Sequence, residues 1–477
     1  MIAKIIVDNK SKQVDKPFDY LVPKELEGKI KIGSRVLVPF SSGNREIEGF
    51  CVGTADTSGS KRLKSIIRTA NDTVGFDEDM LELIEWMHKK YLASYLDIIH
   101  TIVPSGTALK TKEWIILENK SEEKSEIRRR ITEILTDNGG SMEFKGLKEM
   151  CGVDIQNQVR AMIKEGTLKK EYRQSVDIKD KKIKCVKLIC DRETALESAE
   201  ILRRKAPVQA KMLEVLSEND YVSLADLQKF TNGSHSTVKA LEKKNLVNVF
   251  EMTVERDPYW NRVFEKTEKM VPTTEQEYAI DEITNSVKSG DGGIYLLHGV
   301  TGSGKTEVFM QTIENVINMG KSAIMLVPEI SLTPQMVSRF MSRFGGRVAI
   351  FHSGLSAGER YDQWKKIRDG EADIVIGARS AIFTPLKNIG VIIMDEEHSD
   401  TYKSDMSPRY HARETAIFRA SQFGAAVVLA SATPSVESYY KAQTGEYKLL
   451  EMNTRYNKNK MPEISVIDMR SELEKGN

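Results

Sequence analysis

The sequence predicts a multidomain α/β protein with a small, mostly-β N-terminal domain, one or two winged-helix modules and a P-loop α/β domain. A length of 477 residues exceeds what one hydrophobic core serves, because domains commonly hold about 100 to 200 residues. β-branched residues broken by Gly and Pro fill the first 68 positions, whereas strand-like and helix-like stretches alternate from about 270. A degenerate repeat lies between these two regions.

The N-terminal region is expected to form several short strands, as in RVLVPF and EIEGFCVG. From about 76 to 104, apolar residues recur at helical spacing and predict one amphipathic helix packed on that sheet. These residues are Met80, Leu81, Leu83, Ile84, Trp86, Met87, Tyr91 and Leu92. Pro104 and Gly106 mark a boundary, so the first domain is expected to span 1–110.

The repeat has a period near 80 residues, and each copy shows three helical stretches and a basic tail. We interpret the copies as winged-helix-like units at 111–180 and 181–258. Basic residues gather on the third helices and their tails. They are Arg160, Lys164, Lys169, Lys170, Lys239, Lys243 and Lys244. These cations could neutralise DNA phosphates, although docking to another protein explains such modules equally well.

The overall composition is that of a soluble globular chain, with 40% hydrophobic and 29% charged residues. A formal net charge of +1 gives no support for nucleic-acid binding by itself. The first residues are too polar for a signal peptide and no apolar run reaches membrane-span length, so a cytoplasmic location is expected. The cysteines form no CxxC pair, which disfavours zinc and disulfides. They are Cys51, Cys151, Cys185 and Cys190.

A P-loop follows a buried strand in the last third of the chain. The strand IYLLH runs into GVTGSGKT, and the helix EVFMQTIENVINMG comes next, which is the context that the motif requires. Glycines allow backbone N–H groups to converge on phosphate oxygens, Lys305 supplies a charge, and the Thr306 hydroxyl can ligate Mg²⁺. The expected phosphate-binding residues are Gly299, Thr301, Gly302, Ser303, Gly304, Lys305 and Thr306.

A second acidic motif follows the apolar run at 389–395. Asp395 lies at the carboxyl end of this strand, where open α/β sheets bind ligands. It is expected to hold the Mg²⁺, while Glu396 polarises the attacking water and His398 relays toward the γ-phosphate. An acidic helix N-cap is the alternative reading of the motif. Farther on, the hydroxyls of Ser431 and Thr433 follow another strand and could couple nucleotide state to domain movement.

These signatures, in this order, resemble motifs I, II and III of superfamily 2 helicases, which implies that 259–450 is a RecA-like helicase lobe 1. Longer stretches narrow the match to the PriA family of replication-restart helicases. The stretches are GVTGSGKTEVF, LVPEISLTPQ, FHSGLSAGER, IVIGARSAIFTPL, DEEHSDTYKSD and PRYHAR. At the N-terminus, FDYLVP and GSRVLVPF resemble the family's 3′-end DNA-binding domain.

The resemblance also implies roles for individual residues. Gln276 would contact adenine, since a side-chain amide can both donate to and accept from a purine edge. Asp19, between Phe18 and Tyr20, would accept a hydrogen bond from the 3′ hydroxyl of a DNA end, and Lys64 would touch the same end. Without the resemblance, Gln276 reads as a surface residue near a helix start and Asp19 as a turn residue.

An aromatic-rich loop is implied for the segment after DEEH. Its rings would stack on single-stranded bases and its cations would meet phosphates, although a packed loop is the alternative. The residues concerned are Tyr402, Lys403, Arg409, Tyr410 and Arg413. Arg379 and Ser380, in GARSA, match a motif that grips the backbone of the translocating strand. YKS and HARE stand here where the family pattern has YKQ and HARD.

The resemblance implies an ATP- and Mg²⁺-dependent 3′ to 5′ helicase that recognises stalled forks and D-loops and initiates primosome assembly. Single-stranded-DNA-binding protein and primosome proteins would be its partners. A helicase core needs a second lobe, and residues 451–477 supply only its start or a linker. The zinc of the full-length family has no cysteine ligands here. We therefore expect a truncated form that binds ATP weakly and forked DNA measurably, but hydrolyses ATP poorly and does not unwind.

Two other classes remain open at this point. One is a different superfamily 2 DNA translocase, which shares the motifs but has no need of a free 3′ end. The other is a non-catalytic winged-helix DNA-binding regulator in which the P-loop is a vestige.

Overall fold

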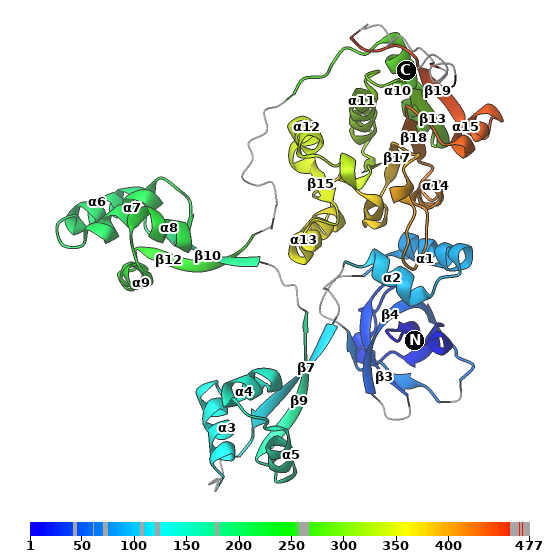
Figure 1. Cartoon of the computed structure of the whole chain (residues 1–477). Helices are drawn as coiled ribbons and strands as arrows, with labels where there is room; N and C mark the ends of the chain where they lie inside the picture. The colour runs from blue at the N-terminus through cyan, green and yellow to red at the C-terminus, as the bar shows by residue number, and fades with distance from the viewer. Residues whose placement is uncertain are drawn as a thin grey trace. The chain divides into compact units, whose positions relative to one another are not determined.

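The computed structural model describes residues 1–41, 45–60, 62–69, 75–104, 109–119, 125–176, 181–254, 256, 267–457, 467 and 470 (Figure 1). The chain separates into two compact units. One unit comprises Met1–Asp177 together with Asn261–Asn477, and the other is Ile178–Trp260. The predicted boundary near 258 and most of the predicted last segment, 451–477, lie outside the described residues.

The N-terminal domain is a six-stranded sheet in the order β5-β2-β1-β4-β3-β6. Its strands are β1 Ile2–Val7, β2 Phe18–Leu21, β3 Arg35–Phe40, β4 Arg45–Ala55, β5 Lys64–Ser65 and β6 Arg68–Thr69. Alternate residues fill a core that includes Ile5, Val36 and Val38, all almost fully buried. The antiparallel pairing of β1 with β2 places Asp19 opposite Lys4 on the sheet.

The single helix expected at 76–104 is wrong, because the structure has two helices there. They are α1 Glu78–Tyr91 and α2 Tyr95–Ile102. Leu92 has a left-handed backbone with φ of 52° and ends α1. The Ser94 side chain then accepts a hydrogen bond from the Asp97 N–H and starts α2. Periodicity alone misses this break, because apolar residues continue across it.

The first winged-helix-like module combines three helices with a three-stranded sheet in the order β8-β7-β9. Its elements are β7 Leu109–Leu117, α3 Glu126–Asp137, β8 Ser141–Glu143, α4 Phe144–Cys151, α5 Gln156–Lys164 and β9 Leu168–Val176. The basic tail is therefore a strand, β9, paired with β7 along its length. The predicted boundary at 110 falls inside β7, so it is too late by one or two residues.

The unit Ile178–Trp260 has the same plan with one additional helix. Its elements are β10 Lys181–Leu188, α6 Arg192–Leu202, α7 Pro207–Ser217, β11 Val222–Ser223, α8 Leu224–Thr231, α9 His235–Lys243 and β12 Val247–Val254. The strands pair in the order β11-β10-β12. Leu213, Leu227 and Leu241, from α7, α8 and α9, share one buried core. The additional helix is α6, whose Ala199 joins that core.

The last domain is a seven-stranded, fully parallel sheet in the order β15-β16-β14-β17-β18-β13-β19. Its strands are β13 Gly293–Gly299, β14 Ser322–Leu326, β15 Val348–Phe351, β16 Ile374–Gly377, β17 Ile389–Asp395, β18 Ala426–Ser431 and β19 Lys448–Met452. The central strands are buried along nearly their whole length, as expected where helices cover both faces. The predicted fold class is confirmed.

Helices connect these parallel strands. They are α10 Thr274–Ser289, α11 Lys305–Asn318, α12 Pro334–Phe344, α13 Ala357–Arg368, α14 Ala412–Ser421 and α15 Val436–Gln443. The predicted domain end at 450 is wrong because it cuts through β19, which pairs with β13 in the sheet. Chain beyond β19 continues along the P-loop, where the Tyr456 N–H donates to the Gly302 carbonyl over 3.0 Å.

Among the described residues, none of the helices has the length and hydropathy of a membrane span. The four cysteines are free, and three of them are buried. Within the same described ranges, His, Cys, Asp and Glu side chains form no cluster that could hold a metal ion by themselves.

Candidate nucleotide and DNA sites

The P-loop connects β13 to α11 at the carboxyl edge of the sheet. Gly302 and Gly304 have φ of 83° and 85°, a backbone region that favours glycine. A Cβ on Gly304 would lie 2.3 Å from the Gln276 Nε2, and a Cβ on Gly299 would lie 2.7 Å from the Ser303 Oγ. Side chains are therefore excluded at these positions, so the backbone of the loop can approach an anion closely. In this structure the Ser303 N–H donates to the Val300 carbonyl over 3.0 Å.

Lys305 begins α11 and reaches back across the loop. Its Nζ donates to the Gly299 carbonyl over 2.7 Å. Burial lowers the pKa of Lys305, while the charges of Glu396 and Asp395 oppose that change. The amine thus lies within electrostatic reach of both carboxylates of the second motif.

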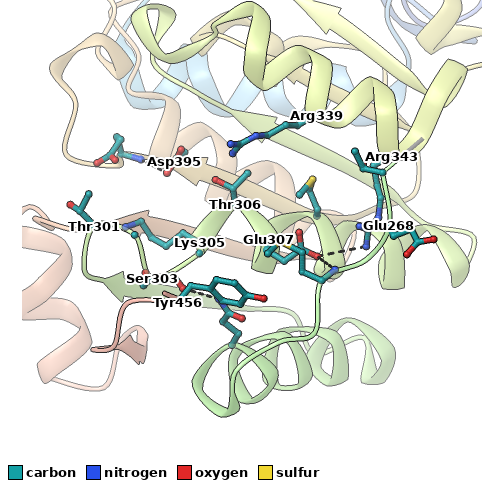
Figure 2. Close-up of a pocket in the computed structure, with 17 residues that line it drawn as sticks. Glu268, Thr301, Ser303, Lys305, Thr306, Glu307, Arg339, Arg343, Asp395 and Tyr456 are labelled. Atoms are coloured by element: carbon teal, nitrogen blue, oxygen red, sulfur yellow. Dashed lines mark hydrogen bonds and ion pairs between the residues drawn. The ribbon is translucent and has the colours of Figure 1, made fainter. Parts of the chain in front are cut away.

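A cavity of about 560 Å³ lies against this loop (Figure 2). The residues that line it come from the segment before α10 and from α10 itself, from the P-loop, from α11 and α12, from the end of β17 and from the chain beyond β19. They are Thr267, Glu268, Met270, Gln276, Thr301, Gly302, Ser303, Gly304, Lys305, Thr306, Glu307, Met310, Arg339, Arg343, Asp395, Glu396 and Tyr456. Lys305, Thr306, Asp395 and Glu396 thus face one cavity, although 90 positions separate Lys305 from Asp395.

Asp395 is the last residue of β17. Burial and the neighbouring Glu396 charge raise the pKa of Asp395 to about 6, whereas Lys305 and the Glu396 N–H lower it. Glu396 has φ of 46°, which turns the chain sharply after the strand. A carboxyl held in this way gains stability as an anion when a cation approaches it, so the site suits a divalent metal.

His398 connects the second motif to the third. Its Nδ1 lies 2.8 Å from the Ser431 Oγ, which also accepts a hydrogen bond from the Thr433 N–H over 2.9 Å. The Glu396 carboxylate lies 3.6 Å from the same Nδ1. His398 does not line the cavity, and its contact with Glu396 connects it to a residue that does.

Glu397 holds the turn of the second motif in place and is buried. Its carboxylate accepts hydrogen bonds from the Ser435 N–H over 2.6 Å and from the Ser438 hydroxyl over 2.9 Å. Arg413 donates to the same carboxylate over 3.2 Å. In this structure Arg413 therefore makes contacts within the domain. The DNA contact that the sequence indicated for Arg413 stays a prediction.

Gln276 lines the cavity but is only 1% exposed. Its Nε2 donates to the Ser303 carbonyl over 2.8 Å, and its Oε1 accepts from the Thr273 N–H over 2.8 Å. These bonds form part of the capping box that starts α10. In this structure the amide ties α10 to the P-loop, and its contact with adenine stays a prediction.

Sequence reasoning missed several residues that line the cavity, among them Arg339, Arg343 and Tyr456. Arg343 is paired with Glu314 over 3.0 Å and lies 3.8 Å from Glu307. Arg339 is exposed and extends over Thr306 in Figure 2. No local motif marks these positions, because α12 and the segment after β19 reach the P-loop only through the packing of the sheet.

The aromatic residues of the segment after the second motif are buried in this structure. Tyr402 is 0% exposed and Tyr410 is 3% exposed, so neither ring is available to stack on a base in this structure. The Tyr402 hydroxyl lies 3.0 Å from the Leu326 carbonyl and 2.6 Å from the Asp395 carbonyl. The hydroxyl is thereby hydrogen-bonded to the last residues of β14 and β17. Burial raises the pKa of both phenols.

The cationic side chains in and around this segment differ in how many contacts they make within the protein. Arg379 donates to the main-chain carbonyls of Thr401 and Lys403, and its guanidinium lies 5.7 Å from the Tyr410 ring. It holds the segment, and Ser380 beside it is half-buried. The Lys403 Nζ donates to the Arg409 carbonyl over 2.6 Å. Both Lys403 and Arg409 remain exposed and able to meet an anion.

The candidate DNA-end residues lie together on β2 and β5. The Asp19 carboxylate accepts a hydrogen bond from the Ser58 hydroxyl over 2.5 Å and is half-buried. Lys64 pairs with Tyr20 in the sheet, and its Nζ donates to the Ser41 carbonyl over 2.6 Å. Phe18 is half-buried. Tyr20 is 4% exposed and belongs to the domain core. The contact of Tyr20 with DNA that the family resemblance implies stays a prediction.

Comparison with known families agrees with both domains. Residues 273–442 match the DEAD/DEAH box helicase family, which defines the class of the P-loop domain. Residues 4–104 match the 3′DNA-binding domain (3′BD) of PriA. The family that the motifs indicated is confirmed: the chain is related to the PriA replication restart proteins.

Relatives match the chain from end to end. Replication restart protein PriA of Bacillus subtilis (strain 168) is 40% identical over 480 residues, which cover 100% of this chain and 58% of that protein. The PriA of Synechocystis sp. is 32% identical, covering 100% of this chain and 57% of that protein. The chain therefore spans a little over half the length of these relatives.

Among solved structures, RecG bound to a three-way DNA junction is 26% identical with a TM-score of 0.30, and the match covers 40% of this chain and 24% of that one. A DEAD box protein from Methanococcus jannaschii is 24% identical with a TM-score of 0.28, over 38% of this chain and 50% of that one.

Proposed function

We propose that this chain is the ATP-binding and DNA-binding part of a 3′ to 5′ DNA helicase that recognises stalled replication forks and D-loops and initiates primosome assembly. One observation carries the proposal: Lys305 and Asp395 face the same cavity at the carboxyl edge of a parallel sheet. A P-loop lysine opposite a strand-end aspartate is the arrangement that P-loop ATPases use for a nucleoside triphosphate and its metal.

The residues of the cavity fit ATP and Mg²⁺. Glycine-lined N–H groups and Lys305 would bind the phosphates, while the Thr306 hydroxyl and the Asp395 carboxylate would hold Mg²⁺. Bound Mg²⁺ would neutralise charge that develops on the phosphates. Glu396 lines the cavity and would orient a water at the γ-phosphate, and the contacts of His398 with Glu396 and Ser431 would link Glu396 to the third motif.

The N-terminal domain is proposed to read the 3′ end of a DNA strand. Asp19 already accepts a hydroxyl hydrogen bond, from Ser58, so a 3′ hydroxyl could take that place. Lys64 lies in the neighbouring strand and carries a positive charge near the same surface. The resemblance to PriA supports forks, D-loops, single-stranded-DNA-binding protein and primosome proteins as partners, and a cytoplasmic location.

Hydrolysis is expected to be slow in the 477-residue chain by itself. The described residues provide one RecA-like lobe, whereas the nucleotide cleft of this class is completed by arginines from a second lobe. The chain should therefore bind ATP and DNA without unwinding. Robust DNA-stimulated ATP turnover by this chain would contradict that expectation.

The 3′-end proposal is tested with forked DNA that carries either a 3′ hydroxyl or a 3′ phosphate at the branch. The unsubstituted chain should prefer the hydroxyl, and Asp19→Ala should remove the preference, because a lost hydrogen bond to a charged group is worth about 1.5–3 kcal/mol. Glu25→Ala, at an exposed carboxylate of the same domain, is the control. Equal binding to both forks by the unsubstituted chain would favour a different superfamily 2 translocase or a winged-helix regulator.

A further inference from the structure

The cavity contains a single aromatic ring among its lining residues, all of which the structure describes, and that ring is Tyr456. Tyr456 is 39% exposed. It lies beyond β19, in a segment that the sequence assigned to the start of a second lobe or to a linker. The ring has no place in the roles described so far.

The backbone of this segment is fixed to the P-loop and to α10. The Val300 N–H donates to the Met452 carbonyl over 3.1 Å, and the Tyr456 N–H donates to the Gly302 carbonyl over 3.0 Å. Between them, the Thr454 hydroxyl donates to the Glu275 carboxylate over 2.8 Å. The chain around Tyr456 is thus held by three hydrogen bonds. The ring is therefore already positioned, and no free loop has to become ordered when a nucleotide binds.

The position of the ring identifies the end of the nucleotide that it can meet. In Figure 2, Asp395 lies above Lys305 and Tyr456 lies below it, beside Ser303. Phosphates held by Lys305 and by a metal on Asp395 occupy the upper side of the loop. The nucleoside then extends away from Asp395, and on that side of the cavity Tyr456 supplies the aromatic ring.

Gln276, the other candidate for the base, is poorly accessible. It is 1% exposed, and both polar ends of its amide are already bonded to Ser303 and Thr273. Because the Tyr456 ring is exposed and the Gln276 amide is buried, we expect the base to be contacted through its face by the ring, and not through its edge by the amide.

We propose that Tyr456 stacks on the base of a purine nucleotide bound at the P-loop, so that the segment after β19 supplies the base site. The inference rests on the proposed function, since it requires ATP in this cavity. Stacking of a base on an aromatic side chain is sequence-tolerant and strong enough to dominate the nucleoside part of the affinity.

Calorimetric titration of the chain with ATP, ADP and tripolyphosphate, each with Mg²⁺, tests the proposal. Tyr456→Ala should weaken ATP and ADP by roughly tenfold and leave tripolyphosphate unchanged, because tripolyphosphate has no base. Tyr456→Phe keeps the ring and should bind ATP like the unsubstituted chain. Tyr440→Ala is the matched control, since Tyr440 is 64% exposed on α15 and does not line the cavity.

The proposal is overturned if Tyr456→Ala binds ATP normally, or if it loses ATP and tripolyphosphate equally, which would assign Tyr456 a role in shaping the loop. An unsubstituted chain that binds tripolyphosphate but gains nothing from the nucleoside also contradicts it. Failure of the proposed function has a different signature: the unsubstituted chain would bind neither ATP nor tripolyphosphate, or Lys305→Ala would bind both normally.

Discussion

The P-loop and the segment 400–411 lie at the same edge of the sheet, yet the sequence predicted the side-chain positions of the first better than those of the second. The P-loop acts through glycine-lined backbone, and Lys305, Thr306, Asp395 and Glu396 face one cavity as the motifs predict. The segment 400–411 acts through side chains, and its rings at Tyr402 and Tyr410 are buried where exposed rings were expected.

A motif that acts through its backbone therefore specifies its own geometry. A motif that acts through aromatic side chains does not specify whether its rings are exposed. A ring is buried or exposed according to what packs beside it. Tyr402 finds two strand-end carbonyls within reach of its hydroxyl, so its burial leaves no unpaired polar group. Substitutions at four positions test this contrast between the two regions.

The largest effect is expected at Tyr402. Tyr402→Ala should destabilise the P-loop domain by about 3–5 kcal/mol, as for other buried aromatic residues cut to Ala. Tyr402→Phe removes only the hydroxyl, leaves the Leu326 and Asp395 carbonyls without it, and should cost about 1–3 kcal/mol. Urea unfolding followed by circular dichroism measures both. Unchanged stability with weakened binding to single-stranded DNA would instead show that the ring is exposed in solution.

Lys305→Ala should weaken ATP binding by about 12- to 150-fold, since a hydrogen bond to a charged group is worth about 1.5–3 kcal/mol. Fork binding should be retained, because Lys305 is half-buried in the nucleotide cavity. Lys288→Ala removes an exposed charge at the end of α10 and serves as the control. Normal ATP affinity in Lys305→Ala would mean that the nucleotide binds elsewhere.

Gln276→Ala should lower the stability of the P-loop domain by about 1–3 kcal/mol, because the half-buried Thr273 N–H and the buried Ser303 carbonyl lose their partner. ATP and GTP should be weakened to a similar extent, since the loop itself is loosened. Parallel titrations with the two nucleotides measure this. A change in the ATP to GTP ratio without a loss of stability would return Gln276 to direct recognition of adenine.

The smallest effect is expected at Arg409, which is exposed in the segment 400–411. Arg409→Ala should weaken single-stranded DNA binding at all sequences and reduce the slope of log affinity against log salt by about 1. Fluorescence anisotropy over a salt series measures the slope. Lys387→Ala, an exposed cation at the opposite edge of the sheet, should leave the slope unchanged. An equal effect at both positions would indicate nonspecific charge.

The sequence predicted the presence of helices and strands better than the residues at which they begin and end. Apolar spacing indicated helix from 76 to 104 but not the break at Leu92, which depends on one left-handed residue and the Ser94 cap. The repeat indicated winged-helix-like modules, yet α6 carried no signal of its own, because its burial depends on small side chains such as Ala199. The strand β19 was missed as part of the sheet, since its partner β13 lies about 150 positions earlier.

The sequence by itself determined the phosphate-binding loop and the acidic strand end, because glycine conformations and the placement of carboxylates at strand ends are local properties of the chain. Tertiary structure alone decided which side chains outside the motifs reach the cavity, and which aromatic rings of the segment 400–411 are exposed. Those outcomes depend on which distant segments pack together, as when Tyr456 meets Gly302 or Tyr402 meets Leu326. No spacing along the chain records such distances.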